Sequence, residues 1–320
     1  MHIARVIAFA VSSLYAAGVF AQAYPTKSVT IVVPYATGGT TDIVSRLIAH
    51  ELTASLGKQV LVDNRTGGGG VVGWSAVARA APDGYTVLAQ ELSYAIGATL
   101  ITTLPFDPRK ALPPVTTAIS VPHVMVVNPS VKASSVKELI ALAKAQPGKL
   151  NYGSGGNGTN THLGGELFKS LAGVDIVHIP YKGAGAVLAD LIAGQVQMLV
   201  SAVTTTLPHV KSGKLRALMV TDDKRSAALA DVPSAPEAGL PQFVMLYWMG
   251  FAVPAGTPQP VVERLNREVT ASLRAADMKK RLADMALDPV GNTPAQAARL
   301  LEEEINRWGA VIKAASIRAD

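Results

Sequence analysis

Cysteine is absent from this chain of 320 residues, and only 16% of the residues are charged and 5% aromatic. Without cysteine the chain has no disulfide, no thiolate metal site and no lipid-attachment cysteine of the bacterial lipoprotein type. The hydrophobic share of 49% excludes a disordered or fibrous protein and predicts a core large enough for two domains. Beyond the N-terminal segment, no apolar run is long enough to span a membrane.

The first 23 residues have the pattern of an export signal. Arg5 supplies a positive start, residues 6–20 are apolar, and Ala21 and Ala23 provide an A-x-A cleavage site. The apolar segment is too short to favour a transmembrane helix. We therefore expect cleavage after Ala21 or Ala23 and a soluble mature protein that is exported and not lipid-anchored.

The formal net charge is +6, a modest basic excess. Such an excess suits an anionic small ligand, although simple solubility accounts for it equally well. The basic residues are scattered, and no basic run is interleaved with aromatic residues. The sequence therefore predicts no nucleic-acid partner.

The stretch VVPYATGGTTD, residues 32–42, has the pattern of a strand, a tight turn and a helix. The apolar strand stops at Pro34, two glycines follow, and apolar residues then recur at helical spacing. The first N–H groups of a helix have no intrahelical acceptor and carry partial positive charge, so such a turn can bind an anion. An ordinary strand-to-helix turn gives the same pattern, so this stretch alone does not identify a site.

A second copy of this order occurs in LNYGSGGNGTNTHL, residues 150–163. A short strand runs into a glycine-rich turn, and a helix follows with Leu163, Leu167 and Leu171 on one face. Two anion-binding turns, one in each half of the chain, are what a binding site between two lobes requires. His162 lies in the second copy, where capping, hydrogen bonding and simple packing stay open as its role.

The remaining pattern predicts an α/β protein. A strand, a helix and a second strand at residues 28–33, 41–56 and 59–62 form a βαβ unit and hence a parallel sheet. A later strand, residues 196–203, runs into polar residues, among them Ser201 and three threonines at 204–206.

The domain organisation follows from two extended apolar segments, near residues 115–129 and 243–253, which we interpret as crossings between domains. A helix over residues 294–314 then packs back on the first domain. We expect a discontinuous first domain of residues 24–120 plus 249–320, a second domain of residues 121–248, and a ligand cleft between them.

The motifs of enzymes and cofactor sites are incomplete. G-x-G-x-x-G occurs at residues 68–73 and 153–158, but the first copy lies away from its strand end and the second lacks a correctly placed acidic residue. No G-x-S-x-G motif exists, and Ser154 and His162 are not arranged as nucleophile and base. The six histidines show no i, i+3 or i, i+4 pairing. We therefore expect no catalytic residue, no metal and no cofactor.

The ordered motifs of the chain resemble those of the Bug family of periplasmic solute-binding proteins, the receptors of tripartite tricarboxylate transporters. The resemblance spans essentially the whole mature chain. The matching segments, in family order, are VPYATGGTTDIVSR, VDNRTGGGGVVG, APDGYTVL, LNYGSGGNGTNTHL, VHIPYKGAG, GKLRALMVT, VPSAPEAGLP and VPAGTPQPVVERLN.

The resemblance implies a two-lobed type II periplasmic-binding-protein fold, or clamshell, in which each lobe is a mostly parallel sheet flanked by helices. Family ligands include di- and tricarboxylates, amino acids and aromatic acids, held largely by backbone amides and waters. The implied role is the capture of such an acid in the periplasm and its delivery to transporter membrane subunits, by a monomer that is not an enzyme.

The residues expected to contact the ligand come from the two turns, from a neighbouring motif and from polar positions at strand ends. We expect backbone N–H groups of residues 36–40 to hold one end of a carboxylate. The candidate ligand-binding residues are Tyr35, Ala36, Thr37, Gly38, Gly39, Thr40, Asp42, Glu91, Ser93, Ser154, Gly155, Asn157, Gly158, Thr159, His162, Tyr181 and Thr204.

Two other functions stay open at this point. An exported hydrolase acting on carboxylic esters would use Ser154 as its nucleophile. A ligand sensor that feeds a two-component kinase would share the binding site and differ only in its partner. Tyr35, Tyr94 and Trp248 are able to accommodate an aromatic acid or to serve the core, so the sequence does not identify the acid.

Overall fold

The computed structural model describes residues 24–318, so the predicted export signal lies outside the described residues. Within this range, no helix has the length and apolar character needed to cross a bilayer. The strands form one sheet in the order β2-β1-β3-β9-β4-β7-β5-β6, and β8 and β10 also pair with β4. Their bounds are β1 (Val29–Val33), β2 (Val60–Asn64), β3 (Thr86–Glu91), β4 (Pro114–Val127), β5 (Asn151–Ser154), β6 (Val177–Pro180), β7 (Met198–Ala202), β8 (Arg216–Val220), β9 (Leu246–Ala252) and β10 (Asp288–Pro289).

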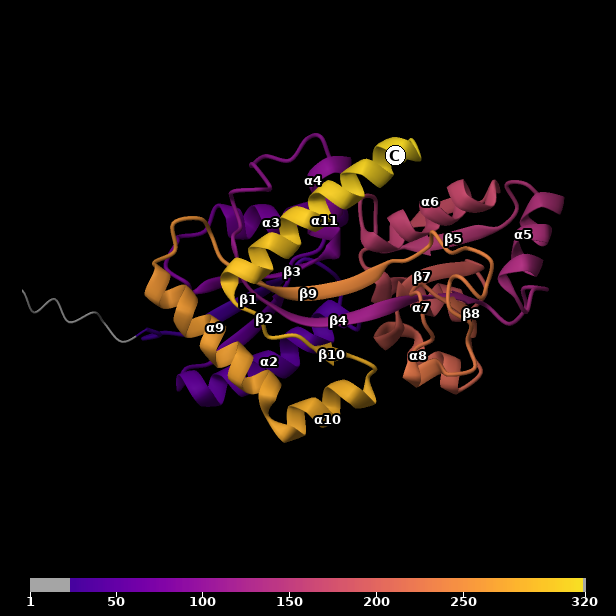
Figure 1. Ribbon diagram of the computed structural model, residues 1–320. Helices are drawn as coiled ribbons and strands as arrows, with labels where there is room; N and C mark the ends of the chain where they lie inside the picture. Colours follow the sequence, from indigo (N-terminus) through magenta and orange to yellow (C-terminus); the bar gives the residue numbers. More distant parts are fainter. Residues whose placement is uncertain (1–23, 319–320) are drawn as a thin grey trace, which may run out of the picture.

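The long strand β4 divides the sheet into two halves. Residues 114–122 of β4 pair with β9, and residues 123–127 pair with β7. We call β1, β2, β3, β9, β10 and their part of β4 the first half, and β5 to β8 with the other part of β4 the second half. Pairing is parallel between β1 and β2, as the βαβ pattern predicted, and between β1 and β3. In the second half β5 pairs in parallel with β6 and β7, as the family resemblance implied. Figure 1 shows β4 and β9 running lengthwise through the middle of the molecule.

The helices flank both halves of this sheet. The C-terminal helix α11 packs against α4 and β4, and therefore lies on the first half, as Figure 1 shows. Their bounds are α2 (Thr40–Leu56), α3 (Val71–Ala78), α4 (Leu92–Leu100), α5 (Val136–Ala145), α6 (Asn160–Ala172), α7 (Ala184–Ile192), α8 (Val203–Lys211), α9 (Gln259–Arg274), α10 (Ala276–Asp284) and α11 (Pro294–Ala314), with 3₁₀ turns η2 (Gly68–Gly70) and η3 (Ala227–Leu229).

Two helices were not expected from the sequence. Residues 203–211 form α8 although threonines and an internal Pro208 give this segment a low intrinsic helix propensity. Residues 92–100 form α4, whose cap is Glu91 rather than a usual capping residue. Burial of residues 203–207, and of most of α4, shows that tertiary packing outweighs local propensity in both segments.

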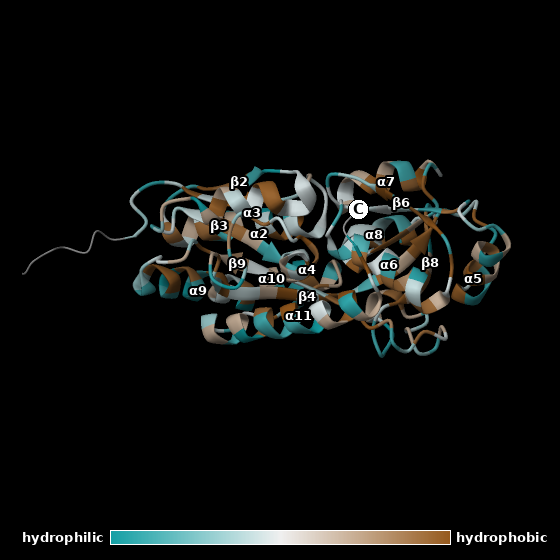
Figure 2. Cartoon of the chain, turned by 90° about the horizontal axis from the view of Figure 1, so that it is seen from above, coloured by the Kyte–Doolittle hydropathy of each residue, from teal (hydrophilic) through white to brown (hydrophobic). Residues whose placement is uncertain are grey.

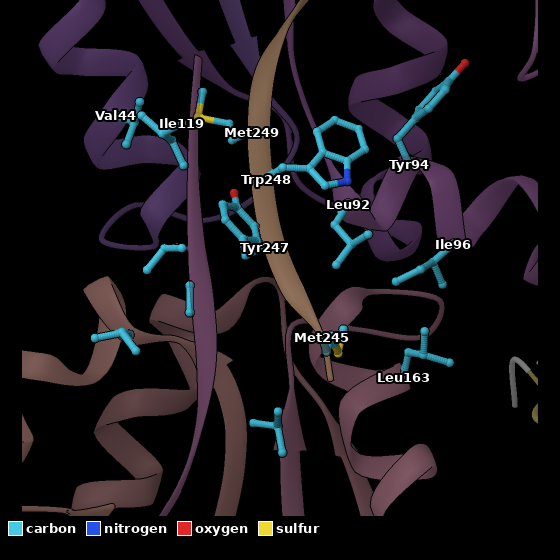
Figure 3. Close-up of a cluster of buried hydrophobic side chains, with 14 of the residues drawn as sticks. Val44, Leu92, Tyr94, Ile96, Ile119, Leu163, Met245, Tyr247, Trp248 and Met249 are labelled. Atoms are coloured by element: carbon cyan, nitrogen blue, oxygen red, sulfur yellow. The ribbon is translucent and has the colours of Figure 1, made fainter. Parts of the chain in front are cut away.

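The core is apolar and continuous between the two halves. In Figure 2 the strands are mostly brown, whereas the helices at the surface carry teal segments. Figure 3 shows Tyr247 and Trp248 leaving β9 on opposite sides, as alternation along a strand requires. Trp248 is 6% exposed and belongs to this core.

The N-terminus of α11 offers a test of how this helix is held. Thr293 Oγ1 accepts from the backbone N–H of Gln296, and the Gln296 side chain accepts from the backbone N–H of Thr293. Thr293→Ala removes this capping box, so the free energy of unfolding in urea should fall by about 1 kcal/mol. Thr293→Ser keeps the capping hydroxyl, and its free energy of unfolding should fall much less. Equal losses for both variants would contradict the capping role.

Candidate functional site

A pocket lies where the carboxyl ends of β1, β3, β5 and β7 meet the beginnings of several helices. Residues of both halves line it. They are Tyr35, Ala36, Gly39, Thr40, Thr41, Asp42, Ser93, Gly155, Thr159, Asn160, Thr161, Ala184, Ser201, Ala202, Thr205 and Tyr247.

Helix N-termini surround this pocket. Lining residues belong to the first turns of α2, α4, α6, α7 and α8. Three of these helices, α2, α7 and α8, begin without a side-chain hydrogen bond to their caps. Their first N–H groups have no intrahelical acceptor, so donors and partial positive charge point at one small volume.

Charged side chains contribute little to the pocket wall. Among the described residues that line it, none is lysine or arginine, and the charged one is Asp42. An anion in this pocket would therefore be held by backbone N–H groups and hydroxyls rather than by a salt bridge.

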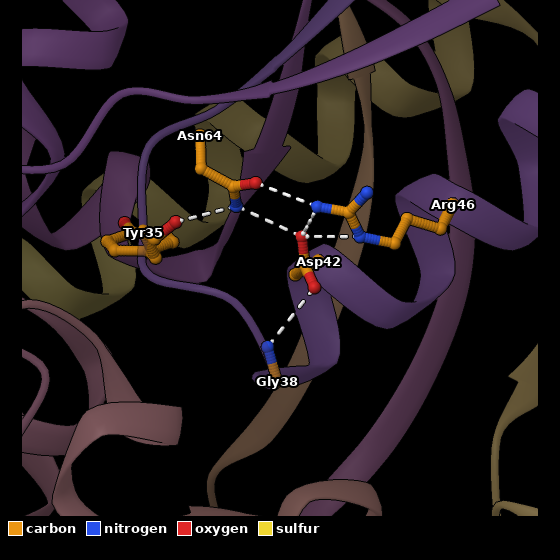
Figure 4. A network of polar contacts seen from close by, with 5 residues as sticks. All are labelled: Tyr35, Gly38, Asp42, Arg46 and Asn64. Atoms are coloured by element: carbon orange, nitrogen blue, oxygen red, sulfur yellow. Dashed lines mark hydrogen bonds and ion pairs between the residues drawn. The ribbon is translucent and has the colours of Figure 1, made fainter.

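The Asp42 carboxylate accepts hydrogen bonds from neighbouring protein groups, as Figure 4 shows. Its Oδ2 accepts from the Gly38 N–H at 3.1 Å, and its Oδ1 accepts from Arg46 Nε and Asn64 Nδ2, each at 3.0 Å. Burial alone would raise the pKa of Asp42, but the hydrogen bonds from Arg46, Asn64 and Gly38 hold it below its ordinary value. Asp42 therefore fixes the shape of the turn, and the Gly38 N–H is not available to a ligand.

The outer edges of the two halves touch beside the pocket. The Ala36 N–H donates to the Lys182 carbonyl at 2.9 Å, so this amide is also unavailable to a ligand. A Cβ atom on Gly185 would lie 2.6 Å from the Thr37 carbonyl oxygen. The backbone at the start of α7 therefore approaches the first turn as closely as glycine permits.

The inner walls of the two halves are also joined. Thr40 Oγ1 and Thr205 Oγ1 share a hydrogen bond of 2.9 Å. Asn160 donates from its backbone N–H and from Nδ2 to Ser93 Oγ, each at 2.9 Å. Every one of these side chains lines the pocket, so the structure is closed around it.

Glu91 lies behind this wall and is 1% exposed. Its Oε2 accepts from the Ser93 N–H at 2.8 Å and from Asn160 Nδ2 at 2.9 Å. Burial raises the pKa of Glu91, although hydrogen bonds from Ser93, Tyr35 and Asn160 oppose this shift. Asn160 Oδ1 in turn lies 2.9 Å from Nε2 of the buried His123, and burial lowers the pKa of His123.

The predicted second turn holds Ser154 and His162, which contact His178 on the neighbouring strand β6. Ser154 Oγ lies 2.5 Å from His178 Nε2 and accepts from the Gly156 N–H at 3.0 Å. His162 Nδ1 accepts from the Gly158 N–H, and the His162 ring stacks on His178 with centroids 4.3 Å apart. Ser154 and His162 are fully buried, so they shape the turn from below.

The structure brings about half of the predicted ligand-binding residues to the pocket. Those that line it are Tyr35, Ala36, Gly39, Thr40, Asp42, Ser93, Gly155 and Thr159. Those that do not line it are Thr37, Gly38, Glu91, Ser154, Asn157, Gly158, His162, Tyr181 and Thr204.

The residues that miss the pocket do so for physical reasons. Thr37 and Gly38 face solvent, and Thr204 Oγ1 donates to the Met285 carbonyl at 3.1 Å. Asn157 and Tyr181 line an adjoining hollow of about 860 Å³ beside the four-glycine loop. A Cβ on Gly158 would meet Ile101, so this glycine serves packing between the halves.

Several lining residues were not among the candidates. Asn160 and Thr161 lie inside the quoted TNTH segment, and Ser201 and Thr205 lie in the polar strand end, so sequence signals for these four existed. Thr41 and Ala184 also lie inside the quoted segments VVPYATGGTTD and VHIPYKGAG. Ala202 and Tyr247 have no comparable signal, Tyr247 because it lies in an apolar strand. The missed lining residues are Thr41, Asn160, Thr161, Ala184, Ser201, Ala202, Thr205 and Tyr247.

The sequence matches the model of a known protein family over most of its length. Residues 44–317 match the model of the TctC group, described as the tripartite tricarboxylate transporter family receptor. The chain belongs to this receptor family. BugT of Bordetella pertussis (strain Tohama I) is 36% identical over 319 residues, which cover 98% of each chain.

Several solved structures superpose closely on this chain. Rpa4515 of R. palustris with adipate gives a TM-score of 0.89 at 36% identity, over 92% of this chain and 99% of that one. MatC (Rpa3494) of Rhodopseudomonas palustris with bound malate gives 0.88 at 33% identity, over 90% and 100%. The predicted α/β periplasmic-binding-protein fold and the predicted family are thereby confirmed.

The hydrolase alternative is wrong. The TctC group consists of solute-binding receptors and not of enzymes, which confirms the prediction for this chain. Ser154 does have a histidine partner, His178, which the sequence did not indicate. Because Ser154 is fully buried and does not line the pocket, that pair is part of the turn and not a nucleophile with its base.

The role of Asp42 in the turn leads to a stability prediction. Asp42→Ala leaves the Gly38 N–H and the Asn64 amide without their acceptor. The free energy of unfolding, measured in urea near neutral pH, should therefore fall by about 1–3 kcal/mol. Arg46→Ala, which removes a half-exposed partner, should lose less than about 1 kcal/mol.

The pH dependence of this loss follows from the lowered pKa of Asp42. The Asp42 carboxylate contributes fully to the free energy of unfolding above the unfolded-state pKa of about 3.9. This contribution disappears as the pH falls through the lower folded-state pKa. The difference between wild type and Asp42→Ala should therefore shrink below about pH 4. A difference that stays constant down to about pH 2 would contradict a role for the ionised carboxylate.

Proposed function

We propose that the mature chain is exported to the periplasm, captures a small organic carboxylate between two lobes, and delivers it to the membrane subunits of a tripartite tricarboxylate transporter. The lobes correspond to residues 24–120 plus 249–320 and to residues 121–248. In this proposal the receptor is a monomer that needs no cofactor or metal and does not bind nucleic acid.

The observation that carries the proposal is the convergence of uncapped helix N-termini on one pocket. The first turns of α2, α7 and α8 present N–H donors there, and each such terminus stabilises an anion by about 0.3–2 kcal/mol. Hydroxyl groups of Thr40, Ser93, Ser201 and Thr205 add further donors. A carboxylate is the organic anion that suits such a set.

The position of the pocket supports capture by closure. Its walls come from both halves, which are linked by β4 and by the chain leading into β9. Hydrogen bonds such as the one between Thr40 and Thr205 join the walls directly. Residues 117–122 and 246–253 are the segments about which we expect the lobes to rotate.

The relatives narrow the class of ligand. Rpa4515 and MatC, whose structures hold adipate and malate, share this fold over nearly the whole chain. Both acids are dicarboxylates, so the relatives favour a small organic acid with two carboxylates. Amino acids and aromatic acids remain within the proposed class.

A thermal-shift screen tests the proposed ligand class. Adipate, L-malate, succinate, L-aspartate and nicotinate are each titrated against the mature protein, with the diamides of adipate and malate as uncharged controls. A ligand at one hundred times its Kd stabilises the folded state by about 2.7 kcal/mol, so a saturable rise in Tm is expected for at least one acid and for neither diamide. Stabilisation by neutral compounds alone would overturn the proposal.

Gly185→Ala separates closure from folding. The added methyl group would meet the Thr37 carbonyl of the facing half, so the lobes should fail to close and the affinity for the acid should fall at least about tenfold. Because Gly185 lies in α7 with ordinary helical φ, alanine favours the helix by about 1 kcal/mol, and Tm without ligand should not fall. Unchanged affinity would contradict this closed contact, and small-angle scattering should show no ligand-induced compaction of the variant.

A further inference from the structure

Three buried side chains form a relay of hydrogen bonds behind the pocket, and both halves contribute to it. Glu91 ends β3 in the first half, whereas Asn160 begins α6 and His123 lies in the second-half part of β4. Asn160 lies 2.9 Å from Glu91 Oε2 through Nδ2 and 2.9 Å from His123 Nε2 through Oδ1. His123 Nδ1 lies 3.1 Å from the Met245 carbonyl oxygen. Glu91 is 1% and His123 0% exposed, so bulk water does not replace a missing partner.

The positions of the hydrogen atoms in this relay can be deduced from the Met245 carbonyl at its end. The Met245 carbonyl oxygen can only accept, so His123 Nδ1 carries a hydrogen. If His123 is neutral, its Nε2 is an acceptor, and the Asn160 carboxamide must turn its NH₂ group toward it. The carboxamide oxygen then faces Glu91, which must be protonated in order to donate to it.

The other orientation of the carboxamide requires the same number of protons. If the NH₂ group faces Glu91, the oxygen faces His123 Nε2, and both ring nitrogens need a hydrogen. His123 is then an imidazolium and Glu91 a carboxylate. Either arrangement holds one proton more than the state in which Glu91 is ionised and His123 is neutral. That state would leave two hydrogen-bond acceptors facing each other in a site without water.

The groups around the relay add no cation that would replace this proton. Glu91 faces the hydroxyls of Tyr35 and Ser93, and Tyr247 on β9 lies between Glu91 and His123, with its ring 5.8 Å from that of His123. Burial raises the pKa of both tyrosines well above 10, so they stay neutral. No lysine or arginine is among the described pocket-lining residues, and Asp42 is paired with Arg46.

We infer that the closed protein binds one proton on the Glu91–Asn160–His123 relay together with its acid ligand. The inference rests on the proposed function, because it is opening of the lobes that separates Glu91 from Asn160 and exposes it to water. Burial raises the pKa of Glu91 and lowers that of His123, which favours the proton on the Glu91 carboxyl. In this state the Asn160 carboxamide is turned about from the orientation described above, so that its oxygen accepts from Glu91 and its NH₂ group donates to His123 Nε2. An anionic ligand beside Glu91 further disfavours its ionisation.

The direction of the linkage follows from the open form. Glutamate and histidine side chains in water have ordinary pKa values of about 4.3 and 6.5. We therefore expect an open form, in which water reaches Glu91, to lack this proton above about pH 6.5. Closure then takes one proton from solvent. Affinity for the acid should fall as the pH rises, by about tenfold per pH unit where uptake is complete.

Calorimetric titration of the mature protein with adipate and with L-malate measures this uptake. Titrations in two buffers of different ionisation enthalpy give the number of protons bound per ligand. Between about pH 7 and pH 8.5 we expect uptake approaching one proton and a Kd that rises about tenfold per pH unit. Saturable binding with no uptake and a constant Kd would overturn the proton site and leave the proposed function standing.

Glu91→Gln assigns the site. The glutamine carboxamide donates to Asn160 Oδ1 as a protonated carboxyl does, so the variant should bind with uptake near zero and a Kd that changes less than about twofold over the same range. At about pH 8.5 it should bind more tightly than wild type. A variant that keeps the wild-type pH dependence would overturn the assignment to Glu91.

Glu304→Gln serves as the matched control. Glu304 is a buried carboxylate on α11 that accepts from Trp308 Nε1 at 2.7 Å and does not line the pocket. This variant should keep the pH dependence of wild type, and loss of that dependence would contradict a specific role for Glu91. If adipate, L-malate and every acid of the thermal-shift screen fail to bind wild type, the proposed function itself is overturned.

Discussion

Helix N-termini carry backbone N–H groups that their own helices do not satisfy, and this structure directs several of them at one pocket. Where α2, α7 and α8 begin without side-chain caps, their donors depend on water or on a ligand. Parallel strands that end at a common edge place these helices side by side, so the chemistry of the site is a consequence of the sheet topology. Side-chain charge is nearly absent from the wall.

The same constraint explains why the site requires both halves. Each glycine-rich turn presents only part of the donor set, and Asp42 and Lys182 already occupy the Gly38 and Ala36 amides. Contacts between facing turns, such as the approach of Gly185 to Thr37, bring the remaining donors together. Closure therefore completes the site and buries Glu91, which is how the proposed capture of an acid becomes linked to a proton.

Much of the fold was predictable because its determinants are local. Helices α2 and α11 lie within one residue of the ranges 41–56 and 294–314 that the sequence predicted. Helix α8 was not predictable, since its threonines and Pro208 oppose a helix that packing alone maintains. At the site, the turn motifs led to Thr40 and Thr159, whereas Tyr247 reaches the pocket from an apolar strand only through long-range packing. Sequence spacing also could not show that Glu91 and His162 point behind the wall.

The central claim is that backbone N–H groups of facing helix N-termini hold the ligand carboxylate. Proton–nitrogen correlation NMR of the mature protein, titrated with the acid that most raises its Tm, tests this most directly. The account predicts that the amide signals of Thr40, Thr41, Thr161 and Thr205 move downfield together with one common Kd, because each lies in the first turn of a helix at the pocket. Saturable binding that leaves these amides unmoved and shifts only signals elsewhere would contradict it.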